Sequence, residues 1–143
     1  MAHTVQQLLT MPQADLDVLF KASPTGPIPA GEATGTAIIA PGSAHAHLIA
    51  QAINLFAWQG KIFDPATGTL RNKILPMGIS AVIAKVYAGD SWLDNKPCIV
   101  IDYSETSLIA GRVRDEIRPI GQGLYLGNVY WDKSHIFDFA LQF

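Results

Sequence analysis

The chain has 143 residues, of which 49% are hydrophobic and 15% are charged, and its formal net charge is -2. This length predicts a single compact domain over residues 1–143, and the high apolar content excludes a disordered chain. The small net charge gives no electrostatic basis for binding nucleic acid or an anionic membrane, so we expect neither partner. No apolar run reaches the roughly 18 residues of a membrane span, and the first residues lack a signal-peptide pattern, which favours a cytoplasmic protein.

Helical patterns occupy two stretches of the N-terminal part. Residues 10–20 contain a proline suited to a first helical turn and place Leu16, Leu19 and Phe20 on one face. Residues 43–59 show the clearer pattern, an apolar stripe between a serine that can cap the helix and a glycine that can end it. The proline-rich connection between them predicts turns rather than a linker between two domains.

The remaining pattern is that of short strands separated by turn residues. Apolar runs recur about every ten residues between Gly, Pro, Asn and Asp, which is the spacing of an antiparallel sandwich or barrel. The expected strands cover residues 35–40, 61–64, 70–75, 79–87, 98–103, 113–120, 124–131 and 136–143. About eight strands predict a closed antiparallel β-barrel, since closure removes exposed edges and leaves room for one small ligand. We expect the helix over residues 43–59 to cover one end, and an α+β roll with an open sheet is the alternative architecture.

Charged side chains concentrate between residues 102 and 118, in a chain with few charges elsewhere. On a strand over residues 113–120, alternation places Arg114, Glu116 and Arg118 on one face and Asp115 on the other. If the Arg114 face points into a barrel, opposite charges pair in a low-dielectric interior that suits binding or proton transfer. If it points outward, it is a solvated surface with little effect on stability. Both orientations remain open from the sequence.

Candidate site residues follow from the inward orientation. Asp102 ends an apolar run, and an arginine such as Arg114 could hold it ionised as a base. The candidate catalytic residues are therefore Asp102, Tyr103, Arg114 and Glu116. The candidate ligand-binding residues are Tyr125, Tyr130, Trp131, Phe137, Phe139 and Arg118. The tyrosines can equally be core or rim residues with satisfied hydroxyls.

We expect no metal and no cofactor. His45 and His47 are two residues apart and would point to different sides of a helix, and His135 is more consistent with a solvent-facing position than with a catalytic one. Cys98, the single cysteine, opens an apolar run and is expected to be a buried, inert thiol. Residues 89–91 read Gly-Asp-Ser, like the start of one esterase motif, but no Asp-x-x-His accompanies them and we interpret them as a turn.

A family resemblance is carried by four strings in the C-terminal part. They are Gly89-Asp90-Ser91-Trp92, Ile101-Asp102-Tyr103-Ser104, Val113-Arg114-Asp115-Glu116-Ile117-Arg118 and Gly123-Leu124-Tyr125-Leu126-Gly127. With them the chain resembles small bacterial proteins of lipocalin-like (calycin) type, and two upstream strings, residues 35–38 and 58–61, extend the resemblance over most of its length. The resemblance implies a ligand-holding barrel and assigns no active-site residues. The Gly-x-Trp motif and the disulfide of secreted lipocalins are absent.

An interior lined by acids, arginines and tyrosines would be more polar than storage of an apolar molecule requires. We therefore expect a small apolar or aromatic molecule to bind in the barrel and to undergo acid/base chemistry without a cofactor, of isomerase, cyclase or lyase type. The alternative is a non-catalytic binding or carrier protein, and a structural module without a ligand would follow from a filled interior. The sequence is also compatible with a homo-oligomer.

Overall fold

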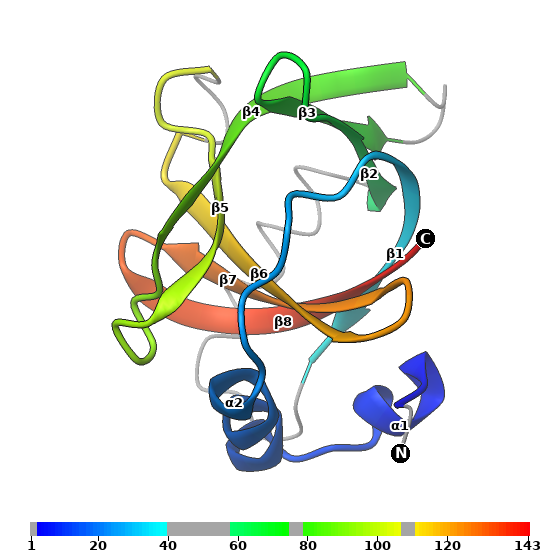
Figure 1. Ribbon diagram of the computed structural model, residues 1–143, viewed down its shortest axis with the longest axis vertical. Coiled ribbons are helices and arrows are strands. Elements are labelled where there is room, and N and C mark those ends of the chain that lie inside the picture. Colours follow the sequence, from blue (N-terminus) through cyan, green and yellow to red (C-terminus); the bar gives the residue numbers. More distant parts are fainter. Residues whose placement is uncertain (1–2, 40–57, 75–78, 107–110) are drawn as a thin grey trace.

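The computed structural model describes residues 3–39, 58–74, 79–106 and 111–143. Eight strands form one closed antiparallel barrel in which every strand pairs with its neighbours in the chain and β1 pairs with β8 (Figure 1). The strands are β1 (Gly31–Ile38), β2 (Trp58–Asp64), β3 (Thr69–Ile74), β4 (Ile79–Asp90), β5 (Pro97–Asp102), β6 (Val113–Gly121), β7 (Leu124–Trp131) and β8 (Ser134–Gln142). Two short helices, α1 (Val5–Leu9) and α2 (Gln13–Ala22), precede them. The predicted barrel with N-terminal helices is confirmed, and the open α+β roll is not formed.

The barrel interior is an apolar cluster to which all eight strands contribute buried side chains. Alternation along each strand explains its membership, because every second side chain points inward. On β6, for example, Val113 and Ile117 belong to this cluster, so Asp115 between them also faces the interior. The direction of each β6 side chain is thereby settled, with Arg114, Glu116 and Arg118 on the outer surface.

A second apolar cluster lies outside the barrel wall, under the helices. Leu8 of α1 and Leu16 and Phe20 of α2 pack there against outward-facing residues of β1, β5, β7 and β8. Figure 1 shows both helices on one side of the barrel. The strands in this region are apolar on both faces because one face lines the interior and the other is covered by helix.

The N-terminal part differs from the expected one in the two helices and at residues 58–59. Helix α1 was not expected, although Thr4 and Gln7 form a capping box that begins it. Helix α2 starts at Gln13 with Pro12 as its N-cap rather than inside the first turn. Of the expected helix over residues 43–59, residues 43–57 lie outside the described residues, while the last two belong to β2. No helix in the described parts of the chain has the length and apolar content needed to cross a bilayer.

Candidate functional site

Four polar side chains meet inside the barrel. Lys61 comes from β2, Asn72 from β3, Tyr103 from the residue after β5, and Asp115 from β6. Each is at most 3% exposed to solvent. Lys61 and Asn72 alternate with the interior residues Phe63 and Leu70, just as Asp115 alternates with its apolar neighbours. Such burial of ionisable groups is uncommon unless they are paired, and here they are paired with one another.

The four side chains are joined to one another by hydrogen bonds. Lys61 Nζ donates to Asn72 Oδ1 and to Tyr103 Oη, both at 2.7 Å, and lies 3.0 Å from Asp115 Oδ2. Asn72 Nδ2 donates to Tyr103 Oη at 2.9 Å, and the Tyr103 hydroxyl donates to Asp115 Oδ2 at 3.3 Å. The three ammonium protons therefore have three acceptors, which fits a buried Lys61–Asp115 ion pair beside a neutral phenol.

Burial shifts the titration of all three ionisable groups. It lowers the pKa of Lys61, against the opposing charge of Asp115. It raises the pKa of Asp115, against the opposing charge of Lys61. Burial and the Asp115 charge together raise the pKa of Tyr103 well above its ordinary value. Because the interior disfavours both charged forms, a proton passes between carboxylate and amine at a lower free-energy cost than in water.

Aromatic side chains surround this network. The Lys61 ammonium lies 5.5 Å from the centre of the Phe139 ring and 5.4 Å from that of Tyr103. Of the residues predicted to bind a ligand, Tyr125, Phe137 and Phe139 belong to the interior cluster and Trp131 packs against it. The interior thus combines apolar surface with a few convergent polar groups, which is the usual composition of a small-molecule site.

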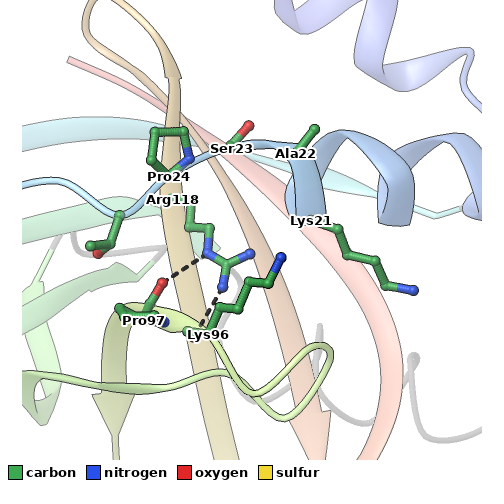
Figure 2. Close-up of a pocket in the computed structure, with 8 residues that line it drawn as sticks. Lys21, Ala22, Ser23, Pro24, Lys96, Pro97 and Arg118 are labelled. Carbon is green, nitrogen blue, oxygen red and sulfur yellow. Dashed lines mark hydrogen bonds between the residues drawn. The ribbon is translucent and has the colours of Figure 1, made fainter.

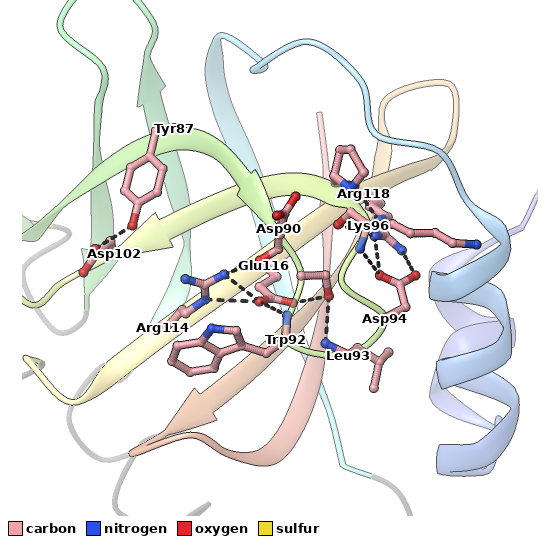
Figure 3. A network of polar contacts seen from close by, with 12 residues as sticks. Tyr87, Asp90, Trp92, Leu93, Asp94, Lys96, Asp102, Arg114, Glu116 and Arg118 are labelled. Carbon is pink, nitrogen blue, oxygen red and sulfur yellow. Dashed lines mark hydrogen bonds and ion pairs between the residues drawn. The ribbon is translucent and has the colours of Figure 1, made fainter.

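The Arg114 face of β6 points outward, yet it is covered rather than solvated. Glu116 is fully buried and accepts hydrogen bonds from Ser91 Oγ at 2.6 Å and from the Trp92 backbone N–H at 2.8 Å. Arg114 donates to Glu116 through Nε at 3.1 Å and Nη2 at 2.9 Å, and its guanidinium stacks on the Trp92 ring (Figure 3). Neither of the two orientations considered from the sequence describes this arrangement, because the segment between β4 and β5 folds over the outer surface.

Arg118 is buried one position further along the same face. Its guanidinium forms two hydrogen bonds of 2.8 Å with the Asp94 carboxylate and stacks on the Phe20 ring of α2. It also donates to the backbone carbonyls of Lys96 and Pro97 at the base of a surface pocket of about 370 Å³, beside Lys21 (Figure 2). Since Asp94 neutralises it and carbonyls occupy its other protons, Arg118 holds the segment between β4 and β5 against α2.

The candidate catalytic residues are therefore divided between two places. Tyr103 lies in the interior network, whereas Asp102, Arg114 and Glu116 lie outside the barrel. Asp102 accepts hydrogen bonds from Tyr87 Oη at 2.7 Å and from the Ser104 hydroxyl at 2.6 Å. These bonds outweigh the effect of partial burial and lower the pKa of Asp102. Asp102 and Arg114 line a surface pocket of about 280 Å³.

Two of the predicted ligand-binding residues, Arg118 and Tyr130, also lie outside. Tyr130 packs edge-to-face on Trp92 and lies beside the His135 ring. His135 is partly buried against Asp138 rather than free in solvent, and Cys98 is buried as expected. Ser91, in the string that resembles an esterase motif, donates its hydroxyl proton to Glu116.

Lys61, Asn72 and Asp115 were not singled out from the sequence. The signal that could have found them is alternation, because each stands two residues from an apolar side chain in its strand. A strand that places an isolated polar residue on its apolar face points to a polar group inside the core. The charge cluster over residues 102–118 pointed instead to the face of β6 that carries Arg114, Glu116 and Arg118.

Comparisons with known proteins support the fold and assign no function. No protein-family model matches the chain, and no curated protein matches its sequence. Among solved structures it is similar to a protein from Thermomonospora curvata, with a TM-score of 0.63 over 93% of this chain and 88% of that one. The identity is 17%, so the likeness shows a shared barrel fold and nothing about shared chemistry.

Proposed function

We propose that the barrel binds a small apolar or aromatic molecule in its interior and transforms it by acid/base chemistry that needs no cofactor. The observation that supports this proposal is the buried network of Lys61, Tyr103 and Asp115. Buried ionisable groups with shifted pKa values and a common hydrogen-bond network are typical of sites of proton transfer. An isomerase, cyclase or lyase reaction fits, because each moves a proton between substrate atoms or removes one from carbon.

The division of roles follows from the charges. Asp115, as the carboxylate, accepts a proton from a carbon atom of the substrate. When substrate binds, Lys61 exchanges its hydrogen bond to Asn72, and the Tyr103 hydroxyl its bond to Asp115, for hydrogen bonds to the oxygen on which negative charge develops. The 3.3 Å separation between Tyr103 Oη and Asp115 Oδ2 then provides a path for returning the proton. No group other than these side chains is required.

A non-catalytic carrier is the second candidate. The interior aromatic residues, among them Tyr125 and Phe137, favour it because they supply apolar contact without chemistry. In a carrier, the Lys61–Asp115 pair would orient a polar group of the ligand. The two functions therefore differ in turnover rather than in binding.

Ring opening of 5-nitrobenzisoxazole tests the proposal. A base removes the proton from the ring carbon of this small aromatic probe, the N–O bond breaks, and a coloured phenolate is released. We expect turnover above the buffer rate in the wild type, and Asp115→Asn to reduce it by about tenfold or more. Asp132→Asn, a change at an exposed carboxylate, is the matched control and should leave the rate unchanged.

The outcomes separate the candidates. Binding of the probe without turnover supports the carrier, and absence of both binding and turnover contradicts both functions for this class of molecule. If Asp115→Asn does not fold, Tyr103→Phe keeps the ring and removes only the hydroxyl, and should still lower the rate. Native mass spectrometry of the protein from its own host would show whether a molecule is retained.

A further inference from the structure

A second polar cluster lies outside the barrel, between α2 and β8. Asp17 of α2 faces His135 and Asp138 of β8, and one potential ligand atom from each lies within 4.8 Å of the others. Gln13 Nε2 donates to Asp17 Oδ1 and to Asp138 Oδ2, both at 2.9 Å, and His135 Nε2 is hydrogen-bonded to Asp138 Oδ1. Two elements far apart in sequence thus bring two carboxylates and an imidazole to one point.

An independent observation comes from β7, on the same outer face. Asn128 lies directly opposite Asp138 in the strand register and is fully buried. Within the described residues, neither its side-chain oxygen nor its nitrogen makes a hydrogen bond of normal geometry, and the Tyr130 hydroxyl, its one polar neighbour at a hydrogen-bond-like distance, makes none either. A buried amide without a well-formed hydrogen bond is destabilising. Directly opposed residues have Cβ atoms roughly 5 Å apart, so the amide is within reach of the Asp138 carboxylate.

The charges around the cluster also favour a cation. Glu116 is the other cross-strand neighbour of Asn128, and its charge is balanced by Arg114. In the described part of the chain, Asp138 forms an ion pair with His135 but with no lysine or arginine, and Asp17 forms none. Asp138 is a buried carboxylate and Asp17 is a second one bonded to the same glutamine, and the His135 imidazole is the one basic side chain paired with them among the described residues, so this face carries more negative than positive charge.

We infer that Asp17, His135 and Asp138 bind a divalent transition-metal ion, with the Asn128 side-chain oxygen as a fourth ligand. Two carboxylates and one imidazole suit Zn²⁺ or Mn²⁺, whereas Mg²⁺ and Ca²⁺ prefer oxygen ligands alone. Binding requires the His135–Asp138 hydrogen bond to open and the Gln13 amide to leave the carboxylates or turn its oxygen to the ion. The ion would fasten α2 to the barrel wall, and it plays no part in the interior chemistry proposed above.

The partial exposure of His135 gives the ion a route from solvent. The sequence indicated no metal because the ligands are spread over positions 17, 135 and 138, and the spacing of two of them matches no single-helix metal motif. Only the packing of α2 on β8 assembles the set.

Isothermal titration of the chelator-treated, desalted protein with Zn²⁺ tests the inference. We expect binding of about one equivalent that raises the melting temperature by mass action, and much weaker binding of Mg²⁺. Asp17→Asn should weaken Zn²⁺ binding by about tenfold or more, as should His135→Gln. Asp15→Asn, at an exposed position on the same helix, is the matched control and should bind like the wild type.

Two results would overturn the inference. One is an absence of stoichiometric Zn²⁺ binding by the folded wild type. The other is unchanged affinity in both Asp17→Asn and His135→Gln, which would place the ion on other histidines of the chain. Because the Asp17 side chain is only partly buried, its variant tests the site even if changes at Asp138 prevent folding.

Discussion

Arg114 and Asp115 are adjacent in sequence and occupy opposite environments. Asp115 pairs with Lys61 in the barrel interior, whereas Arg114 pairs with Glu116 beneath the segment between β4 and β5. One step along a strand exchanges the two faces of the sheet, so a single residue separates two unrelated ion pairs. The interior pair is the centre of the proposed proton transfer, and the outer pair holds the backbone of the segment between β4 and β5 in place.

Gly127 lies at a close contact between β7 and β8. It lies opposite Phe139 in the β7–β8 register, and a Cβ at this position would come within 2.2 Å of the Phe139 ring. The ring therefore occupies the space that a larger residue would need. Phe139 is also the ring beside the Lys61 ammonium, so its position matters to the interior site.

Replacement of this glycine should be costly. Gly127→Ala is expected to lower the free energy of unfolding by about 1–3 kcal/mol, because the Phe139 ring must shift to make room for the added methyl group. Gly121→Ala is the control, since a Cβ there would meet nothing within 4 Å. The urea midpoints of unfolding measure the stability of both variants. Adding Phe139→Leu to Gly127→Ala should restore part of the lost stability. Equal midpoints for the two alanine variants would contradict this account.

The segment between β4 and β5 is fastened to β6 at both ends. Glu116 holds its start through Ser91 and the Trp92 backbone, and Arg118 holds its end through Asp94 (Figure 3). Arg118 also donates to the Phe20 carbonyl at 2.9 Å, which joins α2 to the same assembly. The outer face of β6 is therefore not a solvated stripe. It holds the segment between β4 and β5 and helix α2 in place.

Arg114→Ala tests the strength of this attachment. The change leaves Glu116 buried with two hydrogen bonds and no counter-charge, so we expect a loss of about 3 kcal/mol, the lower end of the range for such deletions. Arg112→Ala is the control, because Arg112 pairs with Asp132 at a side chain 70% exposed and should contribute less than about 0.5 kcal/mol. Chemical denaturation measures the free energy of unfolding of both variants. A cost for Arg114→Ala no larger than that of the control would show that the face is solvated.

The Asp94–Arg118 pair should give stability that depends on pH. Hydrogen bonds from Arg118 lower the pKa of Asp94. Its contribution is therefore complete above the unfolded value, about 3.9, and is lost as the pH falls through the lower folded value. Asp94→Asn should be less stable than the wild type at pH 7, and the difference should shrink below about pH 4. Urea titrations at several pH values measure it, and a difference that grows on acidification would contradict the assignment.

The barrel and its helices form two apolar layers that share the barrel wall. Cys98 lies in the outer layer, where it packs with Leu16 and Phe20 between β5 and the helices. Burial raises the pKa of its thiol to about 12. Reaction of the thiol therefore requires the helices to separate from the closed barrel.

Thiol labelling should accordingly report on opening of the protein. We expect Cys98 to react with 5,5′-dithiobis(2-nitrobenzoate) very slowly in native buffer and rapidly in denaturant, because the thiolate is the reactive form. The rate as a function of urea should follow unfolding measured by circular dichroism. Phe20→Ala, which removes a fully buried side chain of α2, should raise the native rate. Fast labelling of the native wild type would show that the helical layer opens independently of the barrel.

The strands were largely predictable because their signals are local. Alternation and turn residues at Asp132 and Gly123 place the limits of β7 and β8 close to those expected. The Thr4–Gln7 capping box is equally local and is present in the sequence, so α1 was predictable in principle. Such patterns depend only on near neighbours in the chain, and the tertiary structure leaves them intact.

The candidate site was not predictable in the same way. Alternation states that Arg114 and Asp115 lie on opposite faces, but both faces of β6 carry charges, so the pattern alone leaves the inner face undetermined. The inner face of β6 is decided by closure of the barrel. The outer face is the one that α2 and residues 91–97 cover. Lys61 and Tyr103 meet across 42 residues of sequence, and Asp17 meets Asp138 through the docking of a helix. Contacts of this kind are set by strand register and packing, which no local pattern encodes.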